Sequence, residues 1–213
     1  MGHSGADKAR CLVMGSNGLV GSRIAGIMSA KNIPWVGTCN KRPREGMVRL
    51  DITDHEAVRR LLLEVRPEAV FDCANLAGGV DHCERNPDIA RAFHLDSTIN
   101  IGSLCASIGA KMFFISTDYV FDGTRGPYKE DDATNPLNLY GRIKLSAEKW
   151  ISENLKDGVT VRTTNVYGWD PDTVTPNYMM SVYRALKEGK TINAPSYLWG
   201  NPTYADDLAA AIV

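Results

Sequence analysis

The chain lacks the marks of several large classes of protein. Its 24 lysine and arginine residues are balanced by 25 aspartate and glutamate residues, so the formal net charge is only −1. There is no basic block long enough to favour binding to nucleic acid or to an anionic membrane surface. No apolar run approaches the length of a bilayer span, and the first residues show no basic-then-apolar signal pattern. We therefore expect a cytoplasmic protein with no nucleic-acid or membrane partner.

Cysteine is present, but it shows no pairing pattern. The five cysteines are odd in number, widely spaced, and form neither Cys-x-x-Cys pairs nor a ligand pattern with the four histidines. Disulfides and a metal site are therefore not expected. The residues are best explained as small buried side chains in a reducing compartment, at Cys11, Cys39, Cys73, Cys83 and Cys105.

What the chain does contain is an alternation of short β-branched or aromatic runs with longer helical patterns. Apolar residues make up 44% of it, enough to cover a buried sheet on both faces. Strands are expected at 11–14, 35–38, 48–50, 69–73, 112–116 and 159–162, and helices at 19–29, 55–64, 88–108, 136–154 and 179–188, with a last helix beginning near Ala205. Apolar strands separated by helices form parallel βαβ units. The expected fold class is therefore α/β, a Rossmann-type doubly wound parallel sheet.

The pattern changes after residue 162, where prolines 171, 176, 195 and 202 break the chain into short pieces. We expect two units on this basis. Residues 8–165 form an NADP-binding Rossmann domain, and residues 166–213 form part of a smaller C-terminal substrate-binding lobe. Because the last helical pattern runs to the final residue, this lobe is expected to be incomplete.

A glycine-rich turn lies between the first strand and the first helix. Gly15 permits the tight turn, Gly18 lets the backbone approach a pyrophosphate, and Gly21 lets the helix pack closely. The helix N-terminus then offers free N–H groups and a partial positive charge to phosphates. A merely structural turn is the alternative, but the position in the first βα turn favours a dinucleotide site. Its predicted contacts are Gly15, Asn17, Gly18, Leu19, Val20 and Gly21.

The end of the second strand distinguishes between the two nicotinamide dinucleotides. An acid there would hold the ribose 2′-hydroxyl of NAD(H) and repel a 2′-phosphate. This chain instead has Asn40, Lys41 and Arg42, with no acid before Glu45. Guanidinium and ammonium groups match a phosphate in charge. The pattern favours NADP(H) over NAD(H), with a solvated basic loop as the alternative.

Tyr140 and Lys144 lie four positions apart in the helix expected at 136–154, and hence on one face. An ammonium group one turn away favours the phenolate, so we expect it to lower the pKa of the tyrosine. Such pairs are common on helix surfaces, but this pair opens the helix that follows the strand ending in Ser116 and Thr117. Thr117 is therefore expected to bind a carbonyl oxygen that Tyr140 protonates. Gly141 inside the helix indicates that something lies close to the backbone there.

Four segments carry a family resemblance. They are Gly15-x-x-Gly18-x-x-Gly21, Ser116-Thr117-Asp118-Tyr119-Val120-Phe121-Asp122-Gly123, Pro136-Leu137-Asn138-Leu139-Tyr140-Gly141-x-x-Lys144 and Pro202-Thr203-x-x-x-Asp207-Leu208-Ala209. Together they resemble the extended short-chain dehydrogenases, most closely the dTDP-4-dehydrorhamnose reductases and their relative, the methionine adenosyltransferase regulatory β subunit. The strand-end and Tyr-x-x-x-Lys segments are distinctive, whereas the whole superfamily shares the glycine turn.

The resemblance implies that Thr117, Tyr140 and Lys144 are the catalytic triad and that Lys144 also holds the nicotinamide ribose. It implies further cofactor contacts near the adenine, along the phosphates and ribose, and beside the nicotinamide, from Asp51, Ile52, Cys73, Ala74, Asn75, Thr163 and Thr164. The implied activity is NADPH-dependent reduction of the 4-keto group of a nucleotide-linked 6-deoxy sugar, with dTDP as the nucleotide. In relatives, helices such as 88–108 and 136–154 form a four-helix contact, which allows a homodimer.

Several positions depart from the reductase pattern. Asn165 stands where a tryptophan is usual, Tyr197-Leu198 replaces an Asp-Gln pair, and Asp96 stands where the superfamily has an asparagine. Asp81 and Glu84 match the pattern but fall in an expected loop, and His82 and His94 are interpreted as surface or packing residues. Two alternatives therefore stay open beside the reductase. One is a nucleotide-sugar epimerase or epimerase-reductase, and the other is a non-catalytic NADP-binding regulatory subunit.

Overall fold

The computed structural model describes residues 11–42, 44–170, 177–194 and 200–213. Its centre is a parallel sheet of six strands in the order β3-β2-β1-β4-β5-β6. This order confirms the expected Rossmann-type doubly wound sheet. The strands are β1 (Cys11–Met14), β2 (Trp35–Cys39), β3 (Val48–Arg49), β4 (Ala69–Asp72), β5 (Lys111–Thr117) and β6 (Gly158–Thr163).

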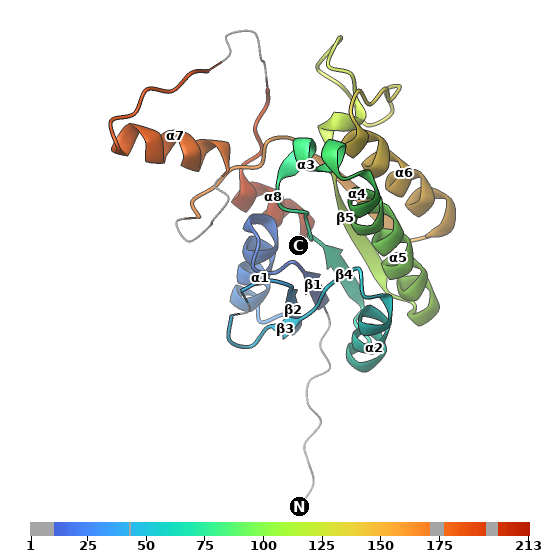
Figure 1. Ribbon diagram of the computed structural model, residues 1–213. Helices are drawn as coiled ribbons and strands as arrows, with labels where there is room; N and C mark the ends of the chain where they lie inside the picture. Colours follow the sequence, from blue (N-terminus) through green and yellow to red (C-terminus); the bar gives the residue numbers. More distant parts are fainter. Residues whose placement is uncertain (1–10, 43, 171–176, 195–199) are drawn as a thin grey trace, which may run out of the picture.

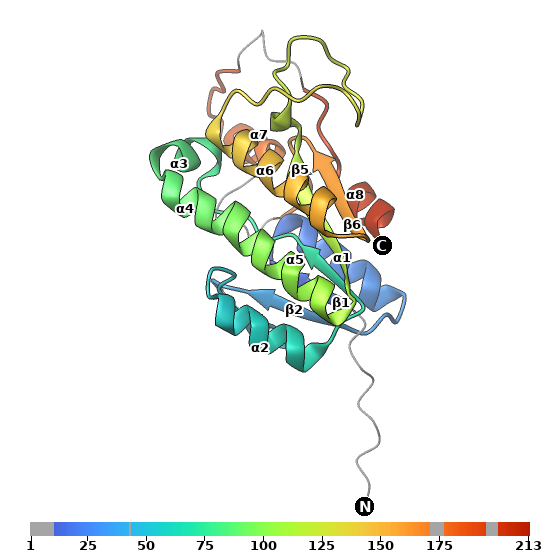
Figure 2. The ribbon, with the colours of Figure 1, turned by 90° about the vertical axis from the view of Figure 1, so that its right-hand side faces the viewer.

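Helices cover both faces of this sheet, as Figures 1 and 2 show. The successive residues of β1 explain why. Leu12 and Met14 pack into a core with residues of α2, α5 and α6, whereas Cys11 and Val13 pack into a second core with residues of α1 and α8. Side chains alternate between the two faces of a strand, so a strand buried on both sides must be apolar throughout. The helices are α1 (Leu19–Ala30), α2 (His55–Val65), α3 (Gly79–Arg85), α4 (Pro87–Arg91), α5 (Ser97–Ile108), α6 (Leu139–Asn154), α7 (Tyr178–Lys187) and α8 (Ala205–Ile212).

Local sequence signals account for several helix ends. Asp54 caps α2 by accepting a hydrogen bond from the Ala57 N–H at 2.9 Å, and the helix stops at Arg66, which adopts a left-handed conformation with φ of 45°. Asn138 caps α6 by accepting from the Gly141 N–H at 2.7 Å. The helix expected at 136–154 therefore begins later, at Leu139, because Asn138 holds the extended conformation of a cap.

The helix expected at 88–108 is present in the structure, with a π-helical stretch inside it that was not expected. It runs as α4, a π-helix at Ala92–Asp96 and then α5. The short helix α3 was not expected. It carries Asp81 and Glu84, so the prediction that these two residues lie in a loop is wrong. A seven-residue helix that begins at a glycine gives too short a periodic pattern to be recognised in sequence.

The segment after β6 leaves the sheet and returns to it. In Figure 1, α7 stands apart from the sheet, whereas α8 packs against α1. Arg23 on α1 pairs with Asp206 on α8 at 3.1 Å, and Ala209 is buried in the core beneath them. Helix α8 thus lies with the sheet domain in space, although it falls within the expected lobe 166–213. Prolines 171, 176 and 195 lie outside the described residues.

In the described part of the chain, no helix combines the length and apolar character of a membrane span. Helices α5 and α6 lie side by side on one face of the sheet (Figure 2). This is the arrangement that a four-helix contact between two copies requires. Dimerisation itself stays a prediction.

Candidate functional site

The glycine turn packs as tightly as its sequence predicts. Gly15 has a φ of +71°, and a Cβ added there would lie 3.0 Å from the Cys73 carbonyl oxygen and the Ala74 backbone. A Cβ on Gly21 would collide with the Gly15 carbonyl group, so glycine is what allows α1 to approach the turn. The turn is tied to the neighbouring strand through the Ser16 N–H, which donates to the Thr38 carbonyl oxygen at 2.9 Å.

The N-terminus of α1 has the properties of an anion site. Gly18 occupies the cap position, no side-chain hydrogen bond caps it, and the first turn of the helix carries no acidic residue. The first N–H groups of a helix have no partner within the helix, and they carry a partial positive charge. An uncapped N-terminus beside a glycine turn fits the pyrophosphate of a dinucleotide. The residues present therefore suit the expected cofactor.

The basic loop lies beside this turn. The Asn17 side-chain amide donates to the Lys41 carbonyl oxygen at 2.8 Å and reaches the Arg42 carbonyl oxygen at 3.5 Å. Lys41 and Arg42 are exposed, and Arg42 has a φ of 58°. The Asn40 amide donates to Asp51 at 2.9 Å. The structure thus brings together the predicted phosphate turn and the residues predicted to select the 2′-phosphate.

Asp51 and Ile52, the two residues predicted to contact the adenine, differ in how far their side chains are exposed to a ligand. Burial works to raise the pKa of Asp51, but hydrogen bonds from Thr53 and Asn40 outweigh this effect and lower it. Asp51 is exposed. Ile52 is only 6% exposed and its side chain belongs to the core, so a cofactor contact from this residue would have to come from its main chain.

The end of β4 adds a residue that sequence reasoning missed. Asp72 is 4% exposed and accepts a hydrogen bond from the Ala74 N–H at 3.3 Å. Burial raises its pKa, and the nearby Lys144 ammonium works against that rise. Burial also raises the pKa of the Cys73 thiol, so this cysteine is no reactive thiolate. Asn75 is exposed at the same end of the sheet. Asp72 could have been recognised from the sequence as a candidate site residue, because it is an acidic residue at the end of an apolar strand.

Lys144 is buried beneath the predicted site. It is 3% exposed, and its Nζ donates to the Ile115 carbonyl oxygen at 2.6 Å and lies 4.0 Å from the centre of the Phe114 ring. Burial lowers its pKa to about 8, although the Asp72 and Glu148 carboxylates work to raise it. The ammonium group is thus held at the carboxyl half of β5, the end of the sheet where the glycine turn lies.

Tyr140 contradicts one expectation. Its pKa is raised, first by burial and then by the negative charges available to Cys83, Asp118 and Tyr119. The prediction that Lys144 lowers this pKa is wrong for the structure, because the ammonium group is turned toward the Ile115 carbonyl oxygen. Sequence spacing placed both groups on one helix face but could not show where the lysine side chain reaches.

Thr117 ends β5 where it was expected, and it is 5% exposed. Its hydroxyl accepts from the Tyr119 N–H at 3.2 Å and donates to the Asp118 carboxylate at 3.2 Å. The 3-10 turn Asp118–Val120 that follows also explains Gly141. A Cβ on Gly141 would collide with the Tyr119 carbonyl group, which confirms that something lies close to this glycine. Thr163, on the neighbouring strand, donates to the Ser116 carbonyl oxygen at 3.2 Å.

A buried ion pair joins the elements around these residues. Glu148, one turn beyond Lys144, is 7% exposed and accepts from Arg162 on β6 at 3.1, 3.1 and 2.7 Å. The Ser116 hydroxyl also donates to Glu148. Arg162 in turn donates to the Glu130 carbonyl oxygen at 3.0 Å. This network links α6, β5, β6 and the loop before α6, and sequence reasoning missed it because its members are far apart in the chain.

Arg162→Met is expected to lower the free energy of unfolding by about 3 kcal/mol, because it leaves the buried Glu148 carboxylate without its partner. Urea denaturation measures the loss. Adding Glu148→Gln to this variant should recover most of it, since the uncompensated charge is then removed. A single variant that unfolds at the wild-type urea concentration would show that the pair contributes nothing to stability.

The helical turn that packs beside Tyr140 carries both Asp96 and His94. Asp96 was aligned with a site asparagine, but it pairs with Arg91 at 3.5 Å and is partly exposed. His94 is 2% exposed, and its ring meets the Tyr140 ring edge to face with centroids 5.3 Å apart. The correspondence of Asp96 to the superfamily asparagine stays a prediction, and His94 is the residue of this turn whose ring contacts Tyr140. His94 lies in the π-helix, which contacts α6 and which no periodic pattern predicts.

Glu84 has a structural role in the same region. Its carboxylate accepts from the Leu139 N–H at 2.5 Å, which supports the first turn of α6 just before Tyr140. Carboxylates are stabilising at helix N-termini. His82 is half-buried and lies 3.4 Å from the Asn86 side chain, in keeping with a packing residue. Tyr197 and Leu198 lie outside the described residues.

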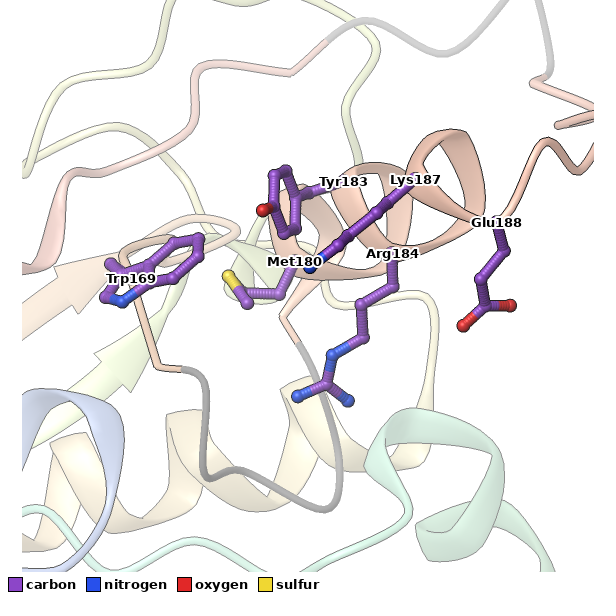
Figure 3. A pocket seen from close by; sticks show the side chains of 6 residues that line it. All are labelled: Trp169, Met180, Tyr183, Arg184, Lys187 and Glu188. Carbon is purple, nitrogen blue, oxygen red and sulfur yellow. The ribbon is translucent and has the colours of Figure 1, made fainter.

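An open hollow lies between the loop after β6 and α7 (Figure 3). The Trp169 and Tyr183 rings meet edge to face with centroids 5.3 Å apart, and the Lys187 Nζ lies 6.0 Å from the Tyr183 ring. The lining residues in the described part of the chain are Trp169, Met180, Tyr183, Arg184, Lys187 and Glu188, none of which was predicted as a site residue. Aromatic faces combined with cations suit the base and phosphates of a nucleotide.

Known proteins resemble the chain over nearly its whole length. A family model described as the RmlD substrate binding domain matches residues 9–213. The methionine adenosyltransferase 2 subunit beta of Bos taurus is 31% identical over 201 residues, 94% of this chain and 60% of the relative. The dTDP-4-dehydrorhamnose reductase of Streptomyces griseus is 33% identical over 204 residues, 95% of this chain and 63% of the relative. The chain thus spans less than two thirds of the length of these relatives.

A solved structure supports the same grouping. The dTDP-4-dehydrorhamnose reductase of Bacillus anthracis, determined in complex with NADP, superposes with a TM-score of 0.84 at 30% sequence identity. The superposition covers 98% of this chain and 71% of that structure. The similarity therefore extends over both the sheet domain and the segment that carries α7.

Proposed function

The chain belongs to the RmlD substrate binding domain family, and we propose that it acts as an NADPH-dependent reductase of the 4-keto group of a nucleotide-linked 6-deoxy sugar, with dTDP as the nucleotide. The observation that carries this proposal is the meeting of three parts at one edge of the sheet. The glycine turn follows β1, Asp72 ends β4, and Thr117 ends β5. Near this end of β5, the Tyr119 and Tyr140 rings meet and Lys144 of α6 donates to the Ile115 carbonyl oxygen. Ligands of doubly wound sheets bind at this carboxyl edge.

The residues of the chain divide the work. Bound NADPH supplies a hydride. The N-terminus of α1 holds the phosphates, and Lys41 and Arg42 select the 2′-phosphate. Tyr140 gives the proton of its hydroxyl to the carbonyl oxygen of the sugar, and Thr117 orients that oxygen. Lys144, whose ammonium group donates to the Ile115 carbonyl oxygen, would hold the nicotinamide ribose.

The sugar nucleotide would extend from this edge toward α7. The hollow lined by Trp169 and Tyr183 offers aromatic faces, and Lys187 offers a cation beside them. These groups support a nucleotide as the carrier of the sugar. An NAD-dependent epimerase is less well supported, because the loop at Lys41 and Arg42 favours a 2′-phosphate.

A non-catalytic regulatory subunit is the second candidate. The 31% identity to methionine adenosyltransferase 2 subunit beta supports it. So do the raised pKa of Tyr140 and the hydroxyl of Thr117, which already hydrogen-bonds to its neighbours. Such a protein would keep the dinucleotide site and bind a partner chain without turnover.

One assay separates the two candidates. The protein is mixed with NADPH and a dTDP-4-keto-6-deoxy sugar, and the absorbance of reduced nicotinamide is followed while NADPH binding is measured by fluorescence. The reductase oxidises NADPH only when the sugar is present. Tight NADPH binding without oxidation, over a panel of nucleotide keto sugars, would support the regulatory subunit. Failure to bind NADPH would contradict both.

Replacing Lys41 and Arg42 with alanine is expected to weaken NADPH binding by about 10- to 100-fold, since each loses a charge-assisted contact with the 2′-phosphate. NADH, which lacks that phosphate, should lose no more than about threefold. Fluorescence titration of both dinucleotides measures the difference. Lys31→Ala, at the far end of α1, is the matched control and should change neither affinity. Equal losses for NADPH and NADH would mean that the loop is only solvated.

A further inference from the structure

His94 occupies an unusual place in the fold. It lies in the π-helix Ala92–Asp96, which interrupts the helix between α4 and α5. π-helical turns are rare, and they occur frequently at functional sites. The turn packs against α6, the helix that carries Tyr140. The His94 ring is 2% exposed and stands edge-on to the Tyr140 ring, with an interplanar angle of 79°.

One nitrogen of the His94 ring makes no contribution to the packing as a polar atom. Within the described residues, the His94 Nε2 is buried and has no hydrogen-bond partner. Buried polar atoms are nearly always hydrogen-bonded, so an exception needs an explanation. A phenylalanine would fill the same space and leave no polar atom unsatisfied. The nitrogen is therefore better explained by a partner that it acquires during function.

The ring is also uncharged. Burial and the Lys144 ammonium lower the pKa of His94 to about 3, so the neutral imidazole is present throughout the physiological range. A neutral imidazole carries one N–H donor and one acceptor nitrogen. It can therefore donate a hydrogen bond without bringing a second positive charge next to Lys144.

Tyr140 needs such a donor. Cys83, Asp118 and Tyr119 all disfavour its phenolate, and Lys144 donates to the Ile115 carbonyl oxygen. Of the two rings that contact Tyr140, those of His94 and Tyr119, the His94 ring has a buried nitrogen without a hydrogen-bond partner within the described residues.

We propose that His94 is a positioning residue for Tyr140: its uncharged ring holds the phenol in place from the α5 side, and its Nε2–H donates a hydrogen bond to the phenolate oxygen once the proton has passed to the substrate carbonyl oxygen. The histidine neither gains nor loses a proton in this step. The inference rests on the proposed function, because it takes Tyr140 as the proton donor.

The first test compares variants of His94 in the full chain. His94→Phe keeps the ring volume and removes the nitrogen, whereas His94→Gln keeps a donor near the place of Nε2. We expect His94→Phe to lower kcat about tenfold, the loss of one hydrogen bond, with the KM for NADPH within about twofold. His94→Gln should recover most of that loss. Phe93→Leu, which changes a ring that also contacts the imidazole, is the packing control.

Several outcomes would overturn the proposal. Wild-type kcat in His94→Phe would show that the ring only fills space. Equal losses in His94→Phe and His94→Gln, with thermal stability lowered to the same degree, would show a structural role alone. If His94→Phe does not fold, His94→Leu takes its place, and the same comparison with His94→Gln decides.

The second test does not depend on turnover. The ¹⁵N resonance of the His94 Nε2 is followed from pH 6 to pH 10 in the protein saturated with NADP⁺. The positive charge of the nicotinamide in bound NADP⁺ favours the phenolate and so works against the burial that raises the pKa of Tyr140. His94 does not itself titrate in this range, so a step in its resonance reports an ionisable neighbour. Lys144, Asp72, Cys83, Asp118 and Tyr119 are the other ionisable groups nearby, and the Tyr140→Phe protein separates their effects from that of Tyr140. We expect one step to disappear in Tyr140→Phe. Identical curves for the two proteins would overturn the proposed hydrogen bond.

The two tests separate this inference from the proposed function. A protein that binds NADP⁺ but reduces no sugar refutes the reductase, while the resonance still tests the His94–Tyr140 contact. A protein that reduces a sugar but shows identical resonance curves keeps the reductase and loses the positioning role.

Discussion

Tyr140→Phe is expected to lower kcat about a thousandfold, the usual contribution of a positioned general acid. The ring itself should stay in place, because it packs against the His94 and Tyr119 rings, with centroids 5.3 and 6.2 Å away. The affinity for NADPH should therefore change by no more than about twofold, since a hydroxyl-only change leaves the glycine turn and the basic loop intact. Stopped-flow measurement of NADPH oxidation and fluorescence titration together give both numbers.

The matched control is Tyr128→Phe. It removes a hydroxyl that donates to Asp122 at 2.6 Å, so it loses a hydrogen bond in the loop before α6 without removing the proton donor. We expect kcat to fall by less than about tenfold in this variant. If Tyr140→Phe were no slower than Tyr128→Phe, Tyr140 would not be the acid.

Gly141→Ala is expected to have the second large effect, on stability and activity together. The added Cβ would lie 2.9 Å from the Tyr119 carbonyl carbon and closer still to its oxygen, so α6 or the 3-10 turn must move. Overpacking of this kind costs about 1–3 kcal/mol. Because the turn that moves begins at Thr117 and the helix carries Tyr140, we expect kcat to fall about a hundredfold as the two groups separate.

Gly26→Ala serves as the control for Gly141→Ala. It changes a glycine in α1 where an added Cβ meets nothing within 4 Å. Alanine is a better helix former, so this variant should gain about 0.5–1 kcal/mol of stability and keep its activity. Thermal unfolding and kcat are measured for both. A Gly141→Ala protein that behaves like Gly26→Ala would show that the close contact with Tyr119 has no consequence.

The sheet could be predicted because its determinants are local. Each apolar run of the expected strands lies within one or two residues of an observed strand, and the cap at Asp54 marks the start of α2. The π-helix at Ala92–Asp96 could not be predicted, because no residue type or periodic pattern specifies it. The start of α6 was placed too early because Pro136 was read as the first helical residue, whereas Asn138 is the cap.

The candidate site could be predicted only where its parts are contiguous in the chain. The glycine turn, the basic loop and the pair on α6 each carry their spacing in sequence. Glu148 and Arg162 meet from a helix and a strand, and Asp72 approaches Lys144 only in the folded chain. The predicted direction of the Tyr140 pKa shift was wrong for the same reason. The burial of the phenol and the hydrogen bond from Lys144 to the Ile115 carbonyl oxygen both arise only in the tertiary structure.

The contact from Asn17 has a consequence for cofactor choice. Its amide reaches carbonyl oxygens of the basic loop, which every amino acid possesses. Asn17 can therefore hold the loop backbone in place whichever side chains stand at positions 41 and 42. Exchanging the two cations for acids would invert the preferred dinucleotide without rebuilding the backbone around them. In this chain, dinucleotide selectivity therefore depends on two side chains, whereas the loop backbone is held by a contact that does not involve them.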